Sequence, residues 1–440
     1  MLRKRVLVLS ATVLALALGA GPAVANDGVT QSQTSSNDNT TTQSATAEAS
    51  SEQANAGGGE QANSGSTDQA ATNANTTSQT AEGSQDASAS YGGDVEQTQS
   101  GTNTNSTDQD ASADADTDQV NAGGGRDDEQ SNSADTDQAA HNSNGTTQSA
   151  NGEQSAETSH GGDVDQDQTG TNSNTTDQDA TADADTDQAN VNVGGRGDSE
   201  QRNRASTDQD VDNGNSTTQS TDGEQNAEAG RHGEVEQSQD GSNSNETDQD
   251  ASAEAETNQA NVFVPICIGV RVCALDNEQR NTSTTTQDVS NDNATGQSVD
   301  GEQFAEALRR ALEQWQEGSN SNSTDQSANA DATTNQANVF IPVCIYVHVC
   351  AISNRQSNTS TTGQDVSNTN STTQSGTGSQ TAASPSGSPW HSSGPAYWSG
   401  HKPSYGHGSK KAKKAKYARK HNKHRKHRKA KKANRRYLRA

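Results

Sequence analysis

Residues 109–119 read QDASADADTDQ, a polar stretch in which residue types alternate strictly. One parity holds only Gln, Ala and Thr, and the other holds only Asp and Ser. A period of two matches a β-strand, whose side chains alternate between two faces, and does not match a helix, whose faces recur every three or four residues. The stretch therefore predicts an extended strand with amide and methyl groups on one face and acidic groups on the other.

That pattern, Q-x-A-x-A-x-A-x-[ST]-x-Q, occurs five times, and successive copies begin 66, 69, 71 and 77 residues apart. Self-similarity at a nearly fixed period is the signature of a repeat architecture. We therefore divide residues 27–383 into five tandem polar repeats, which start near residues 37, 103, 172, 243 and 320. The glutamines that open and close the copies form a predicted repeat ladder: Gln43, Gln53, Gln109, Gln119, Gln178, Gln188, Gln249, Gln259, Gln326 and Gln336.

Two structures are compatible with these repeats. Stacked in register, they would form a thin β-solenoid filled by Ala methyl groups and by Gln and Asn amides that bond to their copies in the next repeat. The alternative is a largely disordered extended chain, because low hydrophobicity (25% apolar residues) and high net charge are typical of unfolded sequences. The expected fold class is all-β and solenoid-like, with one short helix and disordered termini.

The repeats are similar in patterning to the curlin-type repeats of extracellular amyloid fibres. The similarity covers residues 31–380 and lies in evenly spaced Gln and Asn with small residues between them, in tandem. This unit is longer and far more acidic than the curlin unit, so the resemblance implies a stacked β-structure without establishing fibre formation.

Two apolar segments, at 261–275 and 338–352, lie in the fourth and fifth repeats and contain all four cysteines. Both alternate and are predicted to be strands, each with an aliphatic face opposite its cysteines. Six residues of straight strand span about 20 Å, too far for a disulfide within one segment. Disulfides are therefore expected between segments, within or between chains, unless a strand folds back on itself.

The two segments can pair in either direction. Parallel pairing joins Cys267 to Cys344 and Cys273 to Cys350, and antiparallel pairing joins Cys267 to Cys350 and Cys273 to Cys344. The tandem repeat favours the parallel form. A metal site that adds His348 is the rival, but C-x5-C is not a usual zinc spacing and an exported protein meets oxidising conditions.

The two cysteine segments also resemble the chaplin family of actinobacterial surface proteins, whose short modules assemble into amphipathic films. This resemblance implies a surface and assembly role. The family's Gly-Asn after the last cysteine and its apolar second half are missing here. The matching residues are Asn261, Val262, Pro265, Val272 and Cys273, and Asn338, Val339, Pro342, Val343, Val349 and Cys350.

Residues 300–318, DGEQFAEALRRALEQWQEG, predict the one helix of the chain. Asp300 would cap its start and Gly318 its end. An isolated helix of this length is marginal in water, so it is expected to pack on the Val-rich strands. The predicted packing face consists of Phe304, Leu308, Ala311, Leu312 and Trp315.

The first 25 residues have a basic start, an apolar run over residues 6–20 and a small-residue end, Ala23-Val24-Ala25. These are the parts of a secretory signal peptide, and cleavage is expected before Asn26. The chain is therefore expected to be secreted, either extracellular or cell-wall associated, with no membrane span after the signal is removed.

Charge is divided along the chain. Residues 27–400 hold 58 acidic residues against ten arginines and no lysine, a net charge of −48, whereas residues 401–440 hold 18 Lys and Arg and no acid. Residues 384–408 form a Ser, Gly, Pro and aromatic linker, and residues 409–440 form a basic tail. The residues expected to bind anionic polymers are Lys410, Lys411, Lys413, Lys414, Arg425, Lys426, Arg428, Lys429, Arg435 and Arg436.

The predicted function is that of a secreted structural or surface protein of the cell envelope or extracellular matrix. It would assemble through its repeats and cysteine strands and attach through its tail to anionic wall polymers or extracellular DNA. The alternative is an extended binding module that presents the polycationic tail to such polymers. An enzyme is not expected, because no nucleophile, base and orienting group form an identifiable site. No cofactor is expected, and outward aspartates would bind divalent cations only diffusely.

Overall fold

The structure is a computed structural model that describes residues 3–19, 23–25, 28–90, 92–124, 128–194, 198–269, 272–307, 312–345 and 349–383. These residues form β-strands joined by short connections, and none of them lies in a helix. The strands are β1 (Arg3–Gly19), β2 (Ala23–Ala25), β3 (Val29–Gly57), β4 (Gln61–Ala89), β5 (Val95–Gly123), β6 (Asp128–Thr158), β7 (Val164–Val193), β8 (Ser199–Ala229), β9 (Val235–Val264), β10 (Ile266–Ile268), β11 (Val272–Ala307), β12 (Leu312–Phe340), β13 (Val343–Ile345) and β14 (Val349–Ala383).

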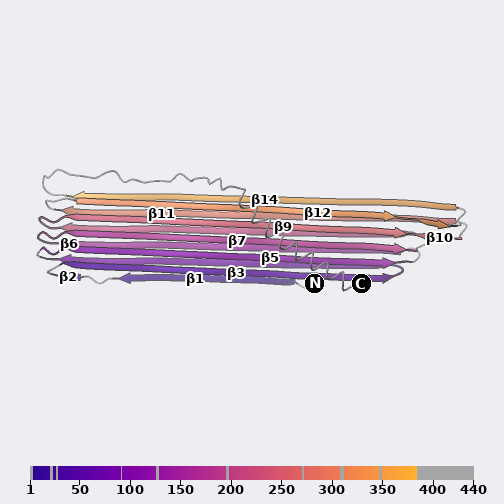
Figure 1. The fold of residues 1–440 in the computed structure, drawn as a ribbon, viewed down its shortest axis with the longest axis horizontal. Coiled ribbons are helices and arrows are strands. Elements are labelled where there is room, and N and C mark those ends of the chain that lie inside the picture. The colour runs from indigo at the N-terminus through magenta and orange to yellow at the C-terminus, as the bar shows by residue number, and fades with distance from the viewer. Residues whose placement is uncertain are drawn as a thin grey trace. The chain divides into compact units, whose positions relative to one another are not determined.

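The long strands build two facing parallel sheets. One sheet has the order β12-β9-β7-β5-β3, and the other has the order β1-β4-β6-β8-β11-β14, with β2 beside β4. Each repeat therefore contributes one strand to each sheet and forms one flat coil, and five coils stack along the body (Figure 1). A strand of 29 residues extends over roughly 95 Å. This confirms the predicted all-β, solenoid-like fold against the disordered alternative.

The register of the stack follows the sequence repeat. Asn37 pairs with Asn103, which pairs with Asn172, then Asn243 and Asn320, so equivalent positions form continuous columns across the first sheet. Every copy of the alternating stretch lies directly on the next copy. Because a slip of one residue would turn every amide outward, the alternation fixes the register.

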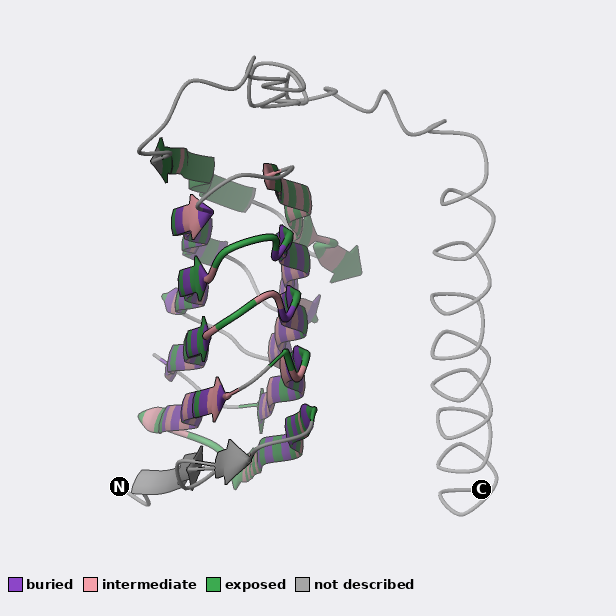
Figure 2. Ribbon diagram, turned by 90° about the vertical axis from the view of Figure 1, so that its left-hand side faces the viewer, coloured by how far each residue is buried: buried purple, intermediate pink, exposed green. Residues whose placement is uncertain are grey.

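The interior is thin and mostly polar. Inward residues alternate with outward ones along every central strand, so buried and exposed positions form stripes (Figure 2). Three small apolar clusters interrupt the amide columns: a Val and Ala cluster near one set of turns, an Ala cluster around Ala111 and Val211 in the middle, and Cys267, Cys273 and Leu275 near the other turns. The fold thus buries methyl groups in narrow rows rather than in one large core.

The predicted helix at 300–318 is wrong. Residues up to Ala307 continue β11, and β12 begins at Leu312, so the described part of this segment is the end of a strand in one sheet and the start of a strand in the other. Ala305 pairs in register with Ala227 and Ala382, and Gln303 occupies the column of Gln225 and Gln380. Pairing on both sides of β11 outweighs the local helix propensity. Leu308 and Ala311, from the predicted packing face, lie outside the described residues.

The segment predicted to be a signal peptide is also extended. Strand β1 pairs in parallel with β4 from Arg3 beside Asp68 to Gly19 beside Ser84, and β2 pairs with the end of β4. Cleavage before Asn26 would therefore remove β1 and β2 and leave β4 with β6 as its only neighbour in the sheet. The linker at 384–408 and the basic tail at 409–440 lie outside the described residues.

Candidate functional site

The glutamines of the repeat ladder form columns of side-chain hydrogen bonds along the stack. In the first column, each Nε2 donates to the Oε1 of the glutamine one coil earlier, at 2.8 Å from Gln109 to Gln43, from Gln178 to Gln109, from Gln249 to Gln178 and from Gln326 to Gln249. Gln109, Gln178 and Gln249 are fully buried. The strict order of the polar stretch therefore has a physical function, because each buried amide finds its partner only in register.

The second column begins one coil later. Gln188 donates to Gln119 at 2.9 Å, Gln259 to Gln188 at 2.9 Å and Gln336 to Gln259 at 2.8 Å. Gln53, in the first coil, donates to the backbone carbonyl of Ser64 at 2.9 Å, and Gln188 likewise donates to that of Arg204 at 2.8 Å. The glutamines of this column thus also bond to the facing sheet.

Asparagine columns, expected beside the glutamines on the inward face, run with the opposite polarity. Asn37 donates to Asn103 at 2.9 Å, and Asn103 donates to Asn172 at 2.9 Å, so here the earlier residue is the donor. The shorter side chain also donates across the interior, as Asn73 does to the backbone carbonyl of Asp110 at 2.7 Å. Because an amide from one sheet reaches the backbone of the other, side-chain bonds hold the sheets together as well as the coils.

Glycine columns make room for one of the glutamine columns. Gln168 donates to Gln99 at 3.2 Å and Gln239 donates to Gln168 at 3.1 Å. A Cβ on Gly223 would overlap Gln239 Nε2 and would lie 2.7 Å from Gln168 Oε1. Repeated Gly at this position is therefore a packing requirement that sequence reasoning missed, although its recurrence once per repeat was a usable signal.

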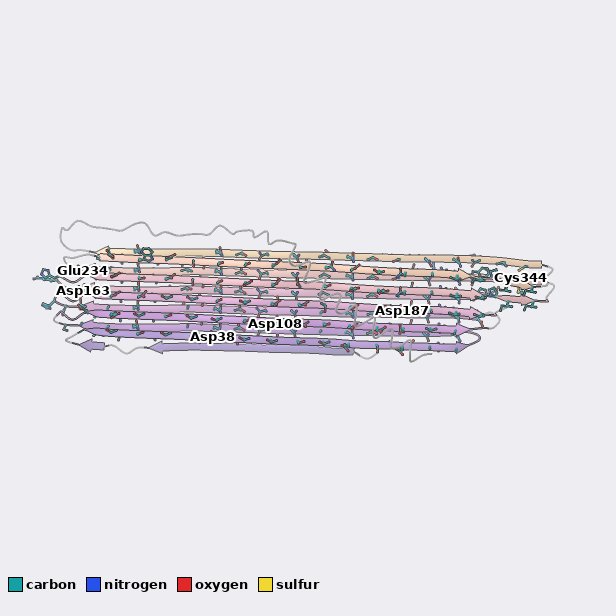
Figure 3. The ribbon with its side chains drawn as sticks, viewed as in Figure 1. Asp38, Asp108, Asp163, Asp187, Glu234 and Cys344 are labelled. Carbon is teal, nitrogen blue, oxygen red and sulfur yellow. A yellow bond between two sulfur atoms is a disulfide. The ribbon has the colours of Figure 1, made fainter. Side chains whose placement is uncertain are left out.

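The cysteine segments are not straight strands. Each is broken near its proline and again at the turn between sheets, where Gly269 has a φ of 68°. This turn brings Cys267 and Cys273 to a Cα separation of 6.3 Å, and they form a disulfide, whereas Cys344 and Cys350 are free and exposed (Figure 3 labels Cys344). The predicted disulfides between segments are therefore wrong, because the strand folds back and places its own two cysteines together.

The parallel register expected for the two segments is present. Cys267 is the β-partner of Cys344, and Cys273 is the β-partner of Cys350. The valines Val262 and Val264 lie opposite Cys267, as expected, and the inward face carries the cysteine together with Phe263, which is buried and stacks on Phe340 with ring centroids 5.7 Å apart. The parity set by the buried Asn261 simply continues, which turns Val262 and Val264 outward. Arg271 and His348 lie outside the described residues.

The sulfur atoms of Cys267, Cys273 and Cys344 all lie within 4.8 Å of one another. Such a group can hold a soft metal ion only when the Cys267–Cys273 disulfide is reduced. In the structure the cluster is therefore a disulfide with two neighbouring thiols rather than a set of metal ligands.

Acidic side chains form the outer surface of both sheets. Asp38, Asp108 and Asp187 lie on β3, β5 and β7, which are neighbouring strands of one sheet. Asp163 and Glu234 lie at the end of the body opposite Cys344 (Figure 3). Burial raises the pKa of Asp240, and the nearby Glu317 and Asp167 raise it further. The pKa values of Asp165, Asp210 and Asp222 are raised in the same way, first by burial. Stacked carboxylates thus repel one another along the columns.

The last coil ends both sheets with uncovered strands. Within the described residues, β12 and β14 each have a neighbour on one side only, as does β3 at the opposite end. Gln326, in the last coil, donates to Gln249 at 2.8 Å. In each earlier coil the equivalent Oε1 accepts from the glutamine of the next coil. Gln326 is only half-buried and ends this column, so its Oε1 is the acceptor that a further coil would use.

Comparison with protein-family models, curated proteins and solved structures found no match. The resemblances to curlin-type repeats and to chaplins rest on the sequence patterns alone. Within the described part of the chain, no helix has the length and hydropathy to cross a membrane. All ten basic residues assigned to polymer binding lie in the tail, outside the described residues.

Proposed function

We propose that this chain is a secreted structural protein of a cell surface or extracellular matrix, whose five-coil body stacks end to end on further copies of itself. The observation that carries this proposal is that the strands at the two ends of the stack carry the same residue columns in the same register. β12 and β14 present the same columns of Asn, Gln and Ala that β3 and β4 present at the other end. A second copy can thus continue every column without a change of register.

The polarity of the ladders supports the same arrangement. Gln columns donate toward the first coil, so the last coil offers acceptors such as Gln326 Oε1. A following copy would continue this column with Gln43, which opens it in the first coil. Head-to-tail stacking thus matches donors to acceptors, whereas contact between two last coils would place acceptors against acceptors.

Removal of the predicted signal peptide would free the second sheet edge. As long as β1 and β2 cover β4, only β3 is open at the first coil. Cleavage before Asn26 would uncover β4 as well, so that assembly would begin only after export. An uncovered parallel edge is a template for further strand pairing.

The experiment compares two double variants of the chain beginning at Asn26. Gln364→Lys/Gln374→Lys places two charges in inward columns of β14, where they would be buried between stacked copies. Ser367→Lys/Ser375→Lys adds the same two charges to the outward face of the same strand. We expect polymers by sedimentation and electron microscopy for the parent and the outward variant, and monomers with an unchanged strand spectrum for the inward variant.

A parent chain that stays monomeric at high concentration would overturn end-to-end stacking. Equal assembly by both variants would mean that the copies associate through another surface. Both outcomes are measured on chains whose circular dichroism shows the strand signal, so loss of folding is distinguished from loss of assembly.

We further propose that the tail attaches the body to anionic wall polymers or extracellular DNA. The support is the tail's charge, with 18 Lys and Arg and no acid over residues 401–440. Binding through phosphate contacts is strongly salt-dependent. Replacing the ten named tail residues with Gln should strongly weaken binding to double-stranded DNA and to a phosphate-bearing wall polymer and reduce its salt dependence. Binding that is insensitive to salt or to these substitutions would contradict this role.

The extended binding module is the second candidate, favoured by the separation of a basic tail from an acidic body. It differs from the first in requiring no assembly. A monomeric body with full polymer binding by the tail would support it.

A further inference from the structure

The four cysteines gather at one point of the solenoid, where the turns of the fourth and fifth coils stack. Cys267 and Cys344 are paired in register on β10 and β13, and Cys273 and Cys350 are paired on β11 and β14. The backbone amide of Gly269 donates to the carbonyl of Ile345 at 2.9 Å, which joins the two turns. The stack therefore fixes one cysteine pair directly on the other.

The two pairs differ in chemical state and in access to solvent. The Cys267–Cys273 disulfide is buried, with its two cysteines 1% and 4% exposed, while Cys344 and Cys350 are free thiols on the surface. The hydrogen bond between the side chains of Cys344 and Cys350 raises the pKa of the Cys344 thiol. The sulfur of Cys344 also lies within 4.8 Å of both sulfurs of the buried disulfide. An exposed thiol thus lies beside a partner thiol and near a disulfide.

We propose that these four cysteines form a thiol–disulfide exchange site in which Cys344 attacks the Cys267–Cys273 disulfide. The inference is independent of end-to-end assembly. In this site, small thiols and disulfides such as reduced and oxidised glutathione react first with the exposed pair, Cys344 and Cys350. The exposed pair then exchanges with the buried pair.

The exchange balances without an external oxidant. The Cys344 thiolate attacks Cys267 Sγ, the bond from Cys344 to Cys267 forms, and Cys273 leaves as a thiolate that takes up the proton lost by Cys344. The Cys350 thiolate then attacks Cys344 Sγ, and Cys267 is released as a thiol. One disulfide and two thiols are present before and after, and only the position of the disulfide has changed.

A second disulfide follows from the same geometry when an oxidant is supplied. Cys344 attacks oxidised glutathione and releases one glutathione thiol, and Cys350 then displaces the second. Two electrons pass to the oxidised glutathione, and a disulfide then joins Cys344 to Cys350 as one already joins Cys267 to Cys273. The buried pair gains or loses its bond through Cys344, because solvent does not reach its sulfurs.

The first experiment traps the intermediate in the full secreted chain. Cys273→Ser/Cys350→Ser leaves Cys267 without a partner in its own turn and removes the thiol that would resolve the intermediate, so oxidation with glutathione should produce a disulfide between Cys267 and Cys344. Non-reducing digestion and mass mapping detect it, and circular dichroism checks that the variant keeps its strands. A folded variant in which Cys267 stays a free thiol would overturn the proposal.

The second experiment uses an otherwise native fold. Reduction of the Cys267–Cys273 bond by reduced glutathione is followed by alkylation and mass mapping in the parent, in Cys344→Ser and in Cys350→Ser. We expect reduction to be about tenfold or more slower in Cys344→Ser, and Cys350→Ser to accumulate the bond from Cys344 to Cys267. Equal rates in all three chains would contradict exchange through Cys344.

A metal-binding outcome would also be decisive. The fully reduced chain is incubated with zinc and then alkylated. Protection of all four thiols with one zinc ion per chain would assign the cluster to a metal and overturn the exchange site. Unprotected thiols in the presence of zinc are the expected result.

Discussion

The side-chain amide of Gln178 donates a hydrogen bond of 2.8 Å to Gln109 Oε1, 69 residues earlier in the chain. Gln178 also accepts at 2.8 Å from Gln249 Nε2 and donates to the backbone carbonyl of Gly214, in the facing sheet, at 3.1 Å. A single buried side chain therefore joins three coils and both sheets. Columns of this kind stabilise the body in place of a large apolar core.

Gln178→Ala should destabilise the body strongly. The substitution removes three hydrogen bonds and leaves the buried Gln109 Oε1 without its donor, which costs about 2–4 kcal/mol in the free energy of unfolding. Thr175→Ala, on the exposed face of the same strand, should change it by less than about 0.5 kcal/mol. Urea unfolding measures both, and equal effects would mean that the amides are not inside.

Gly223→Ala should disrupt the packing of the glycine column. Its Cβ would overlap Gln239 Nε2, and moving that amide breaks the column that Gln168 and Gln239 share. We expect a loss of about 1–3 kcal/mol. Gly214→Ala is the matched control in the same strand, since its nearest heavy atom is 3.9 Å from the new Cβ. Thermal unfolding should separate the two variants, and similar transition temperatures would contradict the close approach.

Adjacent substitutions at the β11 end distinguish strand from helix. Ala305 is fully buried, whereas Phe304 is 42% exposed. Ala305→Asp should therefore cost more than about 3 kcal/mol through burial of an unpaired charge, and Phe304→Asp should cost under about 1 kcal/mol. A helix packed through Phe304 would give the opposite order, which urea unfolding would reveal.

Acidification should stabilise the fold. Burial and neighbouring carboxylates raise the pKa of Asp240 in the folded state above the ordinary value of 3.8. The folded state then binds a proton more tightly than the unfolded state, so this destabilisation is present at neutral pH and is lost as pH falls through the raised pKa toward 3.8. Asp240→Asn should raise the Tm at pH 7 and reduce its rise on acidification. A Tm that falls steadily from pH 7 to pH 4 would contradict this reasoning.

Much of this architecture could be predicted from the alternation. The period of two gave strands, the tandem copies gave the parallel stack, and the fixed positions of Gln109 and Gln119 placed amides inside. The direction of each ladder could not be predicted, because it depends on side-chain length. Gln donates toward the first coil and Asn toward the last.

The two errors share one cause. The helix at 300–318 and the disulfides between the cysteine segments were both predicted from local sequence. Local sequence does not show where the chain turns from one sheet to the other. Pairing of Gln303 with both Gln225 and Gln380 imposes a strand on a helix-forming sequence. The turn at Gly269 brings together Cys267 and Cys273, which a straight strand would separate. Neither turn is visible in the period of two, which continues on both sides of it.

The register of the stack is tested most directly by engineered cross-links in a chain whose four cysteines are replaced by Ser. Ser106 and Thr175 are β-partners in adjacent coils, so Ser106→Cys/Thr175→Cys should form an intramolecular disulfide rapidly and nearly completely. In Ser106→Cys/Thr171→Cys, the second cysteine is displaced by four residues, about 13 Å along the strand, and should remain reduced. Equal yields for the two pairs under the same mild oxidation would show a chain without fixed register and would contradict the two-sheet solenoid.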